Sequence, residues 1–323
     1  MVSDAPGNSD IGFAAAARFP APVGDFVRRS RARSMNETIS LVDSETRCSA
    51  KAAGSGLVPF FVLTFITSWA IEAALLFLPS LRHVLPLFVS PLVKSGLVKD
   101  PIFLICVAAY APTAWGIYFT RRCSGNAGLR DLFARLVRVR VPVVWLLAAV
   151  FLAPLCCTFT AVLARLFTGQ VPEFSARYLT PPFVLWVLAL GGPLNEELGW
   201  RGFALPRLLQ RRSPLAASVG LGVLWAFWHL PLFFDLRSPR GSFATFVVVV
   251  VCFSIVMTAA HLGTRGSLLI AVLFHTSVDA TAGLWHSTRS GPLLPLCFLL
   301  PWLVVAAAIL ICGRMSWCTR PSQ

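Results

Sequence analysis

The sequence predicts an all-α, polytopic membrane protein with about eight transmembrane helices that enclose a polar intramembrane cavity. Hydrophobic residues make up 56% of the 323 residues and charged residues only 13%, whereas a soluble domain holds about 25% charged residues. The apolar residues also fall in runs close to the roughly 20 residues that a helix needs to cross a bilayer. Polar residues inside such runs are expected to share one cavity, because each unpaired polar group would cost several kcal/mol.

The two ends of the chain differ in composition from its apolar centre. Residues 1–54 are polar and basic without sustained periodicity, which predicts a disordered cytosolic tail. Residues 55–315 form the predicted membrane domain, and residues 316–323 form a short C-terminal tail. The first long apolar run begins only near Gly56, so we expect no signal peptide.

Eight apolar segments are the predicted spans: residues 57–79, 101–119, 142–167, 181–209, 214–235, 243–262, 266–287 and 292–312. The segment 181–209 is longer than a bilayer requires. Between the second and third spans, Leu129, Leu132 and Leu136 recur at helical spacing among arginines, which predicts an amphipathic interfacial helix over residues 128–141. Residues 81–100 contain prolines and a glycine and are expected to form a loop or a re-entrant piece.

The positive charge of the chain fits a membrane protein better than a nucleic-acid-binding protein. The net charge is +14, but the arginines cluster at the ends of spans, where they set topology and contact lipid headgroups. Most of the 28 Lys and Arg residues lie on one side if the N-terminus is inside, so both termini are predicted to be cytosolic, and the composition favours a bacterial plasma membrane. The nine cysteines form no CxxC pair, which argues against a disulfide framework or a zinc-thiolate site.

Two adjacent glutamates, Glu196 and Glu197, lie inside the apolar segment 181–209. A carboxylate at bilayer depth costs about 2.5–3.5 kcal/mol on insertion scales, so packing alone does not account for the pair. Arg201 follows Glu197 by four residues and is expected to pair with it on one helix face. Glu196 is rotated by about 100° and is expected to face a cavity as a proton acceptor. The alternative is a structural ion network that closes the bundle.

Among the ionisable residues of the later apolar segments, three are candidates for the same site. His275 and Asp279 repeat the four-residue spacing in LFHTSVDA, and His229 follows the aromatic run LWAFW. Each also has a purely structural interpretation, which is a local hydrogen bond for the pair and a core position for His229. Taken together with the glutamates, these residues predict one shared cavity and hydrolysis of a bond presented within the membrane. A glutamate with two histidines, here Glu196, His229 and His275, is also a donor set for zinc or for a carboxylate-activated water.

At these residues the sequence resembles the CPBP family of intramembrane proteases, also called the CAAX protease and bacteriocin-processing or Abi family. That family carries the motifs EExxxR, FxxxH and HxxxN/D. The first matches Glu196 to Arg201 and the third matches His275 to Asp279, while the second has Trp225 in place of phenylalanine ahead of His229. The resemblance covers roughly residues 57–290, and the ordered triple of motifs is more specific than any one of them.

The resemblance implies glutamate-dependent proteolysis of a membrane-anchored peptide or protein, including prenylated CAAX substrates. It implies Glu196 as the general base, Glu197 and Arg201 as its support, and His229 as a ligand of the water or a metal. His275 and Asp279 would stabilise the oxyanion. Two other readings stay open: a non-catalytic scaffold or bacteriocin-immunity protein of the same fold, and a transporter. The lack of an internal repeat argues against the transporter.

Overall fold

The computed structural model describes residues 56–77, 108–169, 173–234, 242–281, 285–286 and 293–313, and most of them lie in helices. The predicted all-α, multi-pass architecture is confirmed. Within these ranges, four helices are long and apolar enough to cross a membrane: α2 (Leu57–Phe77), α7 (Val143–Thr168), α12 (Phe243–Gly263) and α14 (Leu294–Cys312). Two further apolar helices are shorter, α11 (Pro214–Trp228) and α13 (Leu268–Thr281). The predicted tails and the loop at 81–100 lie outside the described residues.

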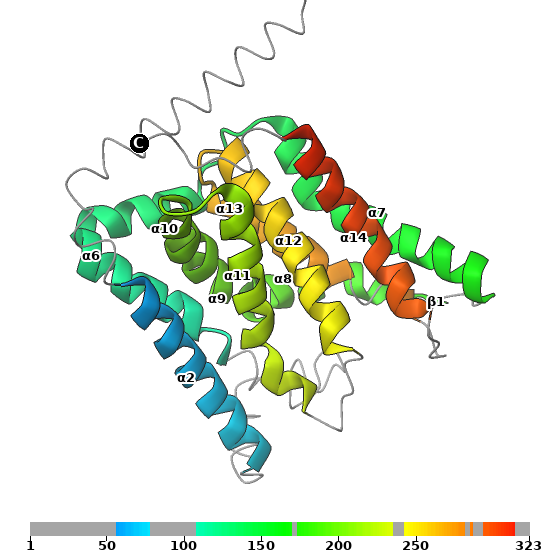
Figure 1. The fold of residues 1–323 in the computed structure, drawn as a ribbon, viewed down its shortest axis with the longest axis horizontal. Helices are drawn as coiled ribbons and strands as arrows, with labels where there is room; N and C mark the ends of the chain where they lie inside the picture. Colours follow the sequence, from blue (N-terminus) through cyan, green and yellow to red (C-terminus); the bar gives the residue numbers. More distant parts are fainter. Residues whose placement is uncertain are drawn as a thin grey trace, which may run out of the picture.

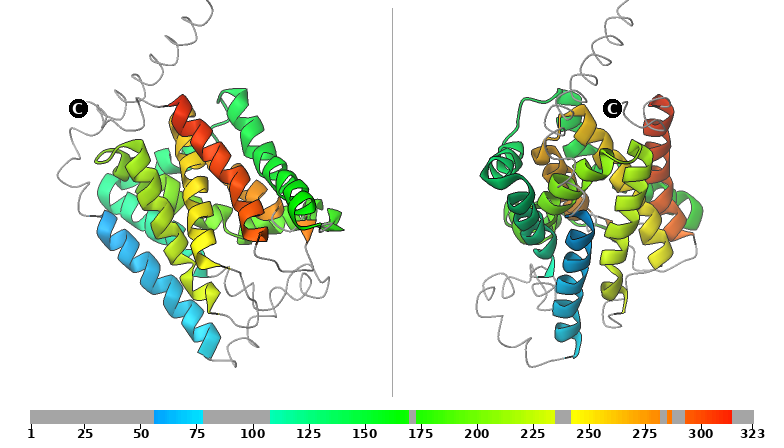
Figure 2. Two further views of the ribbon diagram at one scale, coloured as in Figure 1. Left: turned by 45° about the vertical axis from the view of Figure 1, so that its right-hand side comes forward. Right: turned by 60° about the vertical axis from the view of Figure 1, so that its left-hand side comes forward.

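Helix α12 lies at the centre of the bundle and packs against α11, α13 and α14 (Figure 1). Of the residues in its most apolar stretch, 61% are buried, compared with 22–28% in α2, α7 and α14. A helix that is apolar on all sides is buried by protein or lipid, and here α12 takes the protein-buried place. Helices α7 and α14 pack together on one side of the bundle, and α2 lies on the other side against α6 and α11 (Figure 2).

Helix α6 (Ala111–Leu136) overlaps both the span predicted at 101–119 and the interfacial helix predicted at 128–141. It consists of two helices that meet at a kink at Gly125, whose φ of 61° and ψ of −157° are not helical, so the predicted division into two helices is confirmed. Leu132 is fully buried and clusters with Leu198 and Leu268. The expected apolar stripe therefore contributes to the protein core, and it does so because the later elements provide apolar partners that local periodicity does not reveal.

The predicted single span at 181–209 is broken into four short pieces, which is the largest correction to the sequence prediction. These are α8 (Pro181–Leu190), α9 (Pro193–Glu197), the π-helix η2 (Leu198–Ala204) and α10 (Leu205–Leu209). Gly192 has φ 139° and ψ −45°, a backbone conformation that L side chains rarely adopt. Pro193 follows it and lacks the N–H that a continuing helix would need. The helix therefore ends at Leu190 and restarts at Pro193.

The carbonyl groups exposed by this break are satisfied by side chains. Tyr110 Oη donates to Ala189 O at 2.7 Å, and Asn195 Nδ2 donates to Leu190 O at 3.1 Å. Thr113 Oγ1 donates to Leu194 O at 3.1 Å, at the start of the second helix. Backbone polar groups inside a membrane protein must find partners within the protein, and the bonds from Tyr110 and Asn195 allow a broken helix at this depth.

The remaining elements lie at the ends of helices. The span predicted at 266–287 ends early, at the C-terminus of α13, and the strand β2 (Trp285–His286) then pairs antiparallel with β1 (Glu173–Phe174). A 3₁₀ turn, η1 (Ala176–Leu179), leads into α8. The span predicted at 214–235 is helical only to Trp228, and the 3₁₀ turn η3 (Leu230–Phe233) follows. His229 is therefore the C-cap residue of α11.

Candidate active site

The π-helix η2 holds the candidate residues in the interior because its backbone touches α6. A Cβ added to Gly199 would lie 2.3 Å from the carbonyl oxygen of Pro112, and one added to Gly116 would lie 2.8 Å from the Cα of Gly199. Two glycines thus permit a backbone contact that any side chain would prevent. π-Helical turns are rare and are frequent at functional sites. Both glutamates lie at the end of α9, directly before this segment, and are buried, with Glu196 3% exposed and Glu197 fully buried.

The predicted pairing of Glu197 with Arg201 is confirmed. Arg201 Nη1 donates to Glu197 Oε1 at 3.1 Å, and both residues are fully buried. The same oxygen also lies 2.8 Å from His275 Nδ1 on α13, a contact that the sequence alone did not predict. Glu197 therefore links the broken helix to α13 through charged hydrogen bonds, which are stronger than neutral ones.

Glu196, which the sequence predicts to face a cavity as a proton acceptor, has one of its two oxygens bound by neighbouring side chains. Its Oε2 accepts two indole hydrogen bonds, from Trp225 Nε1 at 2.6 Å and from Trp200 Nε1 at 3.2 Å. Rotation on an ideal helix correctly separated the two glutamates, but it did not supply these partners. The two tryptophans fix one carboxylate oxygen and leave Oε1 as the oxygen turned toward the rest of the cluster.

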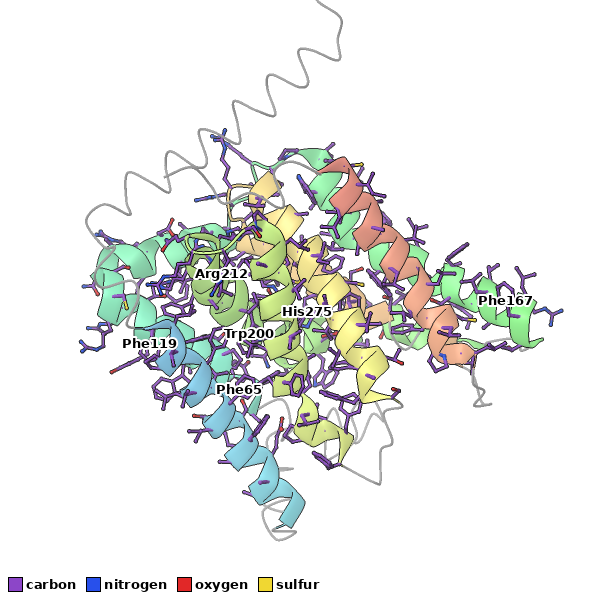
Figure 3. The ribbon with its side chains drawn as sticks, viewed as in Figure 1. Phe65, Phe119, Phe167, Trp200, Arg212 and His275 are labelled. Carbon is purple, nitrogen blue, oxygen red and sulfur yellow. The ribbon has the colours of Figure 1, made fainter. Side chains whose placement is uncertain are left out.

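The space above Gly192 is where the candidate residues meet. A Cβ added there would lie 2.8 Å from Glu196 Oε1 and 3.4 Å from both Asp279 Oδ2 and His275 Cε1. The glutamate, the histidine and the aspartate thus surround one point that only a glycine leaves open. Figure 3 shows His275 in the middle of the helices, with Trp200 nearby in this view.

His275 lies between two carboxylates. Its Nδ1 faces Glu197 Oε1 at 2.8 Å, and its Nε2 lies 3.4 Å from Asp279 Oδ2. A neutral imidazole has one N–H donor and one acceptor nitrogen, while an imidazolium donates from both nitrogens. An imidazolium is therefore the form that suits both contacts. The four-residue spacing of His275 and Asp279 predicted their proximity, and the structure confirms it.

His229 is linked to the cluster through Trp225. Its Nδ1 donates to the backbone carbonyl of Trp225 at 2.9 Å, which in a neutral ring places the proton on Nδ1 and the acceptor at Nε2. Aromatic rings surround the imidazole, with centroid distances of 4.7 Å to Trp228 and 5.3 Å to Phe246. The imidazole is thus held by aromatic packing and by the end of α11.

The donor set Glu196, His229 and His275 suits a metal only in part. The Nδ1 atoms of both histidines have a carbonyl or carboxylate partner, as metal-bound imidazoles do. Within the part of the chain that the structure describes, however, no group of three His, Cys, Asp or Glu side chains is gathered as a metal site. The residues therefore do not fit a three-ligand zinc centre in this conformation.

Sequence reasoning missed three residues of this cluster: Trp200, Trp225 and Gly192. The signal for Trp225 was present, because tryptophan replaces the phenylalanine of the FxxxH pattern and brings an N–H group. The Gly-Gly-Pro run directly before the glutamates was the signal for Gly192, since such a run ends a helix.

Comparison with known proteins shows what the segment that holds these residues is similar to. Residues 178–281 match the family model described as type II CAAX prenyl endopeptidase Rce1-like. The chain is also 27% identical over 224 residues to CAAX prenyl protease 2 of Methanococcus maripaludis, and this alignment covers 64% of the chain and 80% of that relative. All of the predicted site residues lie inside the matched segment, and both similarities indicate a peptide hydrolase.

Proposed function

We propose that this protein is an intramembrane endopeptidase of the CAAX protease type in which Glu196 activates the hydrolytic water. The observation that carries the proposal is the arrangement around Gly192. Glu196 Oε2 is held by two indole N–H groups, and Oε1 lies near His275 and Asp279 around the point that a Cβ on Gly192 would fill. A fixed carboxylate beside a positively charged donor is what water activation and oxyanion stabilisation require.

In the proposed reaction, Glu196 Oε1 accepts a proton from a water molecule while the water oxygen attacks the peptide carbonyl carbon. The carbonyl oxygen becomes an oxyanion beside the His275 imidazolium, whose positive charge stabilises it. Asp279 and Glu197 keep that ring oriented through its two nitrogens. Glu196 then gives the proton to the leaving amine as the C–N bond breaks. His229, which is bonded to the backbone carbonyl of Trp225, helps to position the water.

The substrate we propose is a membrane-anchored peptide or protein of the prenylated CAAX type. The matched family model and the relative from Methanococcus maripaludis are both described by this activity. The site is buried among apolar helices, which suits a substrate that arrives through the lipid. Burial of a prenyl chain in the membrane contributes about 0.8 kcal/mol per methylene group. This anchor would hold the attached peptide bond close to the depth of the site.

We further propose that both termini are cytosolic and that the protein resides in a bacterial plasma membrane. Arginines from distant segments gather at one end of the bundle, where Arg138 Nη1 donates to Arg265 O and Arg135 Nε lies 3.1 Å from Asp131 Oδ2. Basic residues collect on the cytosolic side of membrane proteins. The end of the bundle with Arg135, Arg138 and Arg265 would therefore face the cytosol.

Zinc, if bound, would have Glu196, His229 and His275 as its ligands and would supply a polarised water. Because the described side chains do not gather three such ligands, the steps above are assigned to the side chains of the protein alone.

The decisive experiment compares the wild-type protein with Glu196→Gln in nanodiscs, using a farnesylated CAAX peptide with a quenched fluorophore. Loss of a general base lowers turnover by about 10²–10⁴-fold, and the isosteric glutamine keeps the packing. Asp131→Asn is the matched control, because this carboxylate on α6 is 58% exposed and does not belong to the candidate cluster. The same peptide without its prenyl group tests the substrate class.

Equal turnover by wild type and Glu196→Gln would refute the assignment of the base. The alternative of a non-catalytic scaffold or immunity protein makes a different prediction. In that case no peptide is cleaved by the wild type, and Glu196→Gln and His275→Ala leave the cellular phenotype unchanged.

A further inference from the structure

Trp225 stands where the FxxxH pattern has phenylalanine, and three contacts of its indole bear on the two glutamates. Its Nε1 donates to Glu196 Oε2 at 2.6 Å. Its ring face lies 4.1 Å from the Arg201 guanidinium carbon, and its ring and the His275 ring are nearly perpendicular at a centroid distance of 5.2 Å. This buried side chain, 3% exposed, therefore contacts Glu196 directly. It also contacts Arg201 and His275, the two partners of Glu197.

We propose that Trp225 is a positioning residue that fixes Glu196 in the orientation needed for water activation. This inference rests on the proposed function of Glu196 as the base. The indole acts through its N–H group and through its ring face.

The N–H group decides which oxygen of Glu196 does the chemistry. At 2.6 Å its hydrogen bond is at the short end of the range for bonds to a carboxylate, and the second indole, from Trp200, is longer at 3.2 Å. Both bonds go to Oε2, which saturates that oxygen. The carboxylate group is thereby held with Oε1 toward Gly192, where a Cβ would lie 2.8 Å from it. Phenylalanine has no donor and leaves only the longer bond.

The ring face connects the two glutamates. The Arg201 guanidinium lies over it and at the same time donates to Glu197 Oε1 at 3.1 Å. A cation–π contact in a desolvated site contributes about 2 kcal/mol, so the indole stabilises the arginine that neutralises Glu197. Through its N–H group and its face, Trp225 sets the position of both neighbouring carboxylate groups relative to each other.

Trp225→Phe separates these two parts, because the ring face and edge remain while the donor is lost. A hydrogen bond to a charged group is worth about 1.5–3 kcal/mol, so we expect kcat to fall roughly 10- to 100-fold, with KM changed by less than about threefold. Trp225→Leu also removes the ring face and is expected to lose more. Trp200→Phe removes the longer bond and is expected to lose less than Trp225→Phe.

Trp302→Phe on α14 is the matched control. This tryptophan is 1% exposed, and its Nε1 has no hydrogen-bond partner among the described residues. Trp302→Phe therefore makes a buried aromatic ring smaller, as Trp225→Phe does, but it removes no hydrogen bond to a carboxylate. We expect its kcat to stay within about twofold of the wild type.

A second measurement does not depend on turnover. In ¹⁵N-indole spectra of the labelled protein, Glu196→Gln should shift two indole resonances, namely those that disappear in Trp225→Phe and Trp200→Phe. If Trp225→Phe keeps the wild-type kcat, or if its indole resonance ignores Glu196→Gln, the positioning role is overturned. Failure of the proposed function looks different, because then the wild type cleaves no peptide while the two resonances still shift.

Discussion

Gly192→Ala tests the centre of the candidate site with the smallest change that the chain allows. The mutation adds one methyl group at the point where Glu196 Oε1, Asp279 Oδ2 and His275 Cε1 meet. No charged or hydrogen-bonding group is removed. Any loss of activity therefore reports on the space above Gly192 and on the backbone there.

Two effects add in this variant. The backbone at φ 139° and ψ −45° is strained for an alanine, by about 1–3 kcal/mol. The new Cβ would also lie 2.8 Å from Glu196 Oε1, closer than real Cβ contacts come, so the carboxylate must move. If it rotates away from its indole partners, a charged hydrogen bond worth about 1.5–3 kcal/mol is lost as well.

A carboxylate displaced by about 1 Å is enough to lower turnover by about 10²-fold. We therefore expect Gly192→Ala to lose at least about 100-fold in kcat on the farnesylated peptide and to unfold at a temperature several degrees lower. Both quantities are measured on protein in the same nanodiscs, with thermal unfolding followed by tryptophan fluorescence.

Gly220→Ala on α11 is the control, because a Cβ there meets nothing within 4 Å. Alanine is favoured over glycine inside a helix by about 1 kcal/mol, so this variant should be at least as stable as the wild type and equally active. If Gly192→Ala were as active and as stable as Gly220→Ala, the space above Gly192 would not be part of the site and the reasoning would fail.

Two further predictions concern charge and metal. Glu197→Gln leaves the buried Arg201 without its anionic partner and His275 without one of its carboxylates, so thermal unfolding should show a loss of about 3–5 kcal/mol; the exposed Asp131→Asn should lose at most about 1 kcal/mol, and equal losses would contradict the network. We expect proteolysis to survive dialysis against EDTA, because Glu196 Oε2 already accepts two indole hydrogen bonds. One zinc ion per chain, lost in both Glu196→Ala and His229→Ala, would instead assign these residues to a metal.

Much of the architecture followed from composition and periodicity. The spans at 57–79, 142–167, 243–262 and 292–312 correspond closely to α2, α7, α12 and α14. Long apolar runs are strong signals because the bilayer requires about 20 apolar residues. The prediction of a single span at residues 181–209 was wrong. It followed the length of the apolar run and did not take account of Gly192 and Pro193, which end one helix and start the next.

Local spacing also predicted the contacts that lie within one helical turn. Glu197 with Arg201 and His275 with Asp279 are four residues apart, and both pairs are in contact. Contacts between segments were beyond this reasoning. The hydrogen bond from Trp225 to Glu196 joins residues 29 positions apart, and that from His275 to Glu197 joins residues 78 positions apart.

The sequence by itself determined that this chain is a helical membrane protein, because the length of each apolar run is a local property of the chain. It also showed that carboxylates and imidazoles lie inside these runs, where burying them costs free energy. It also determined the motifs that resemble the CAAX protease family. Only the tertiary structure decided how the two glutamates divide their roles. Glu197 is held by an arginine and a histidine, and Glu196 is held by two indoles. Arg201 and Trp200 follow their glutamates by four residues, a spacing that the sequence displays. Trp225 and His275 come from helices that meet only when the bundle packs, so no spacing along the chain specifies these two partners.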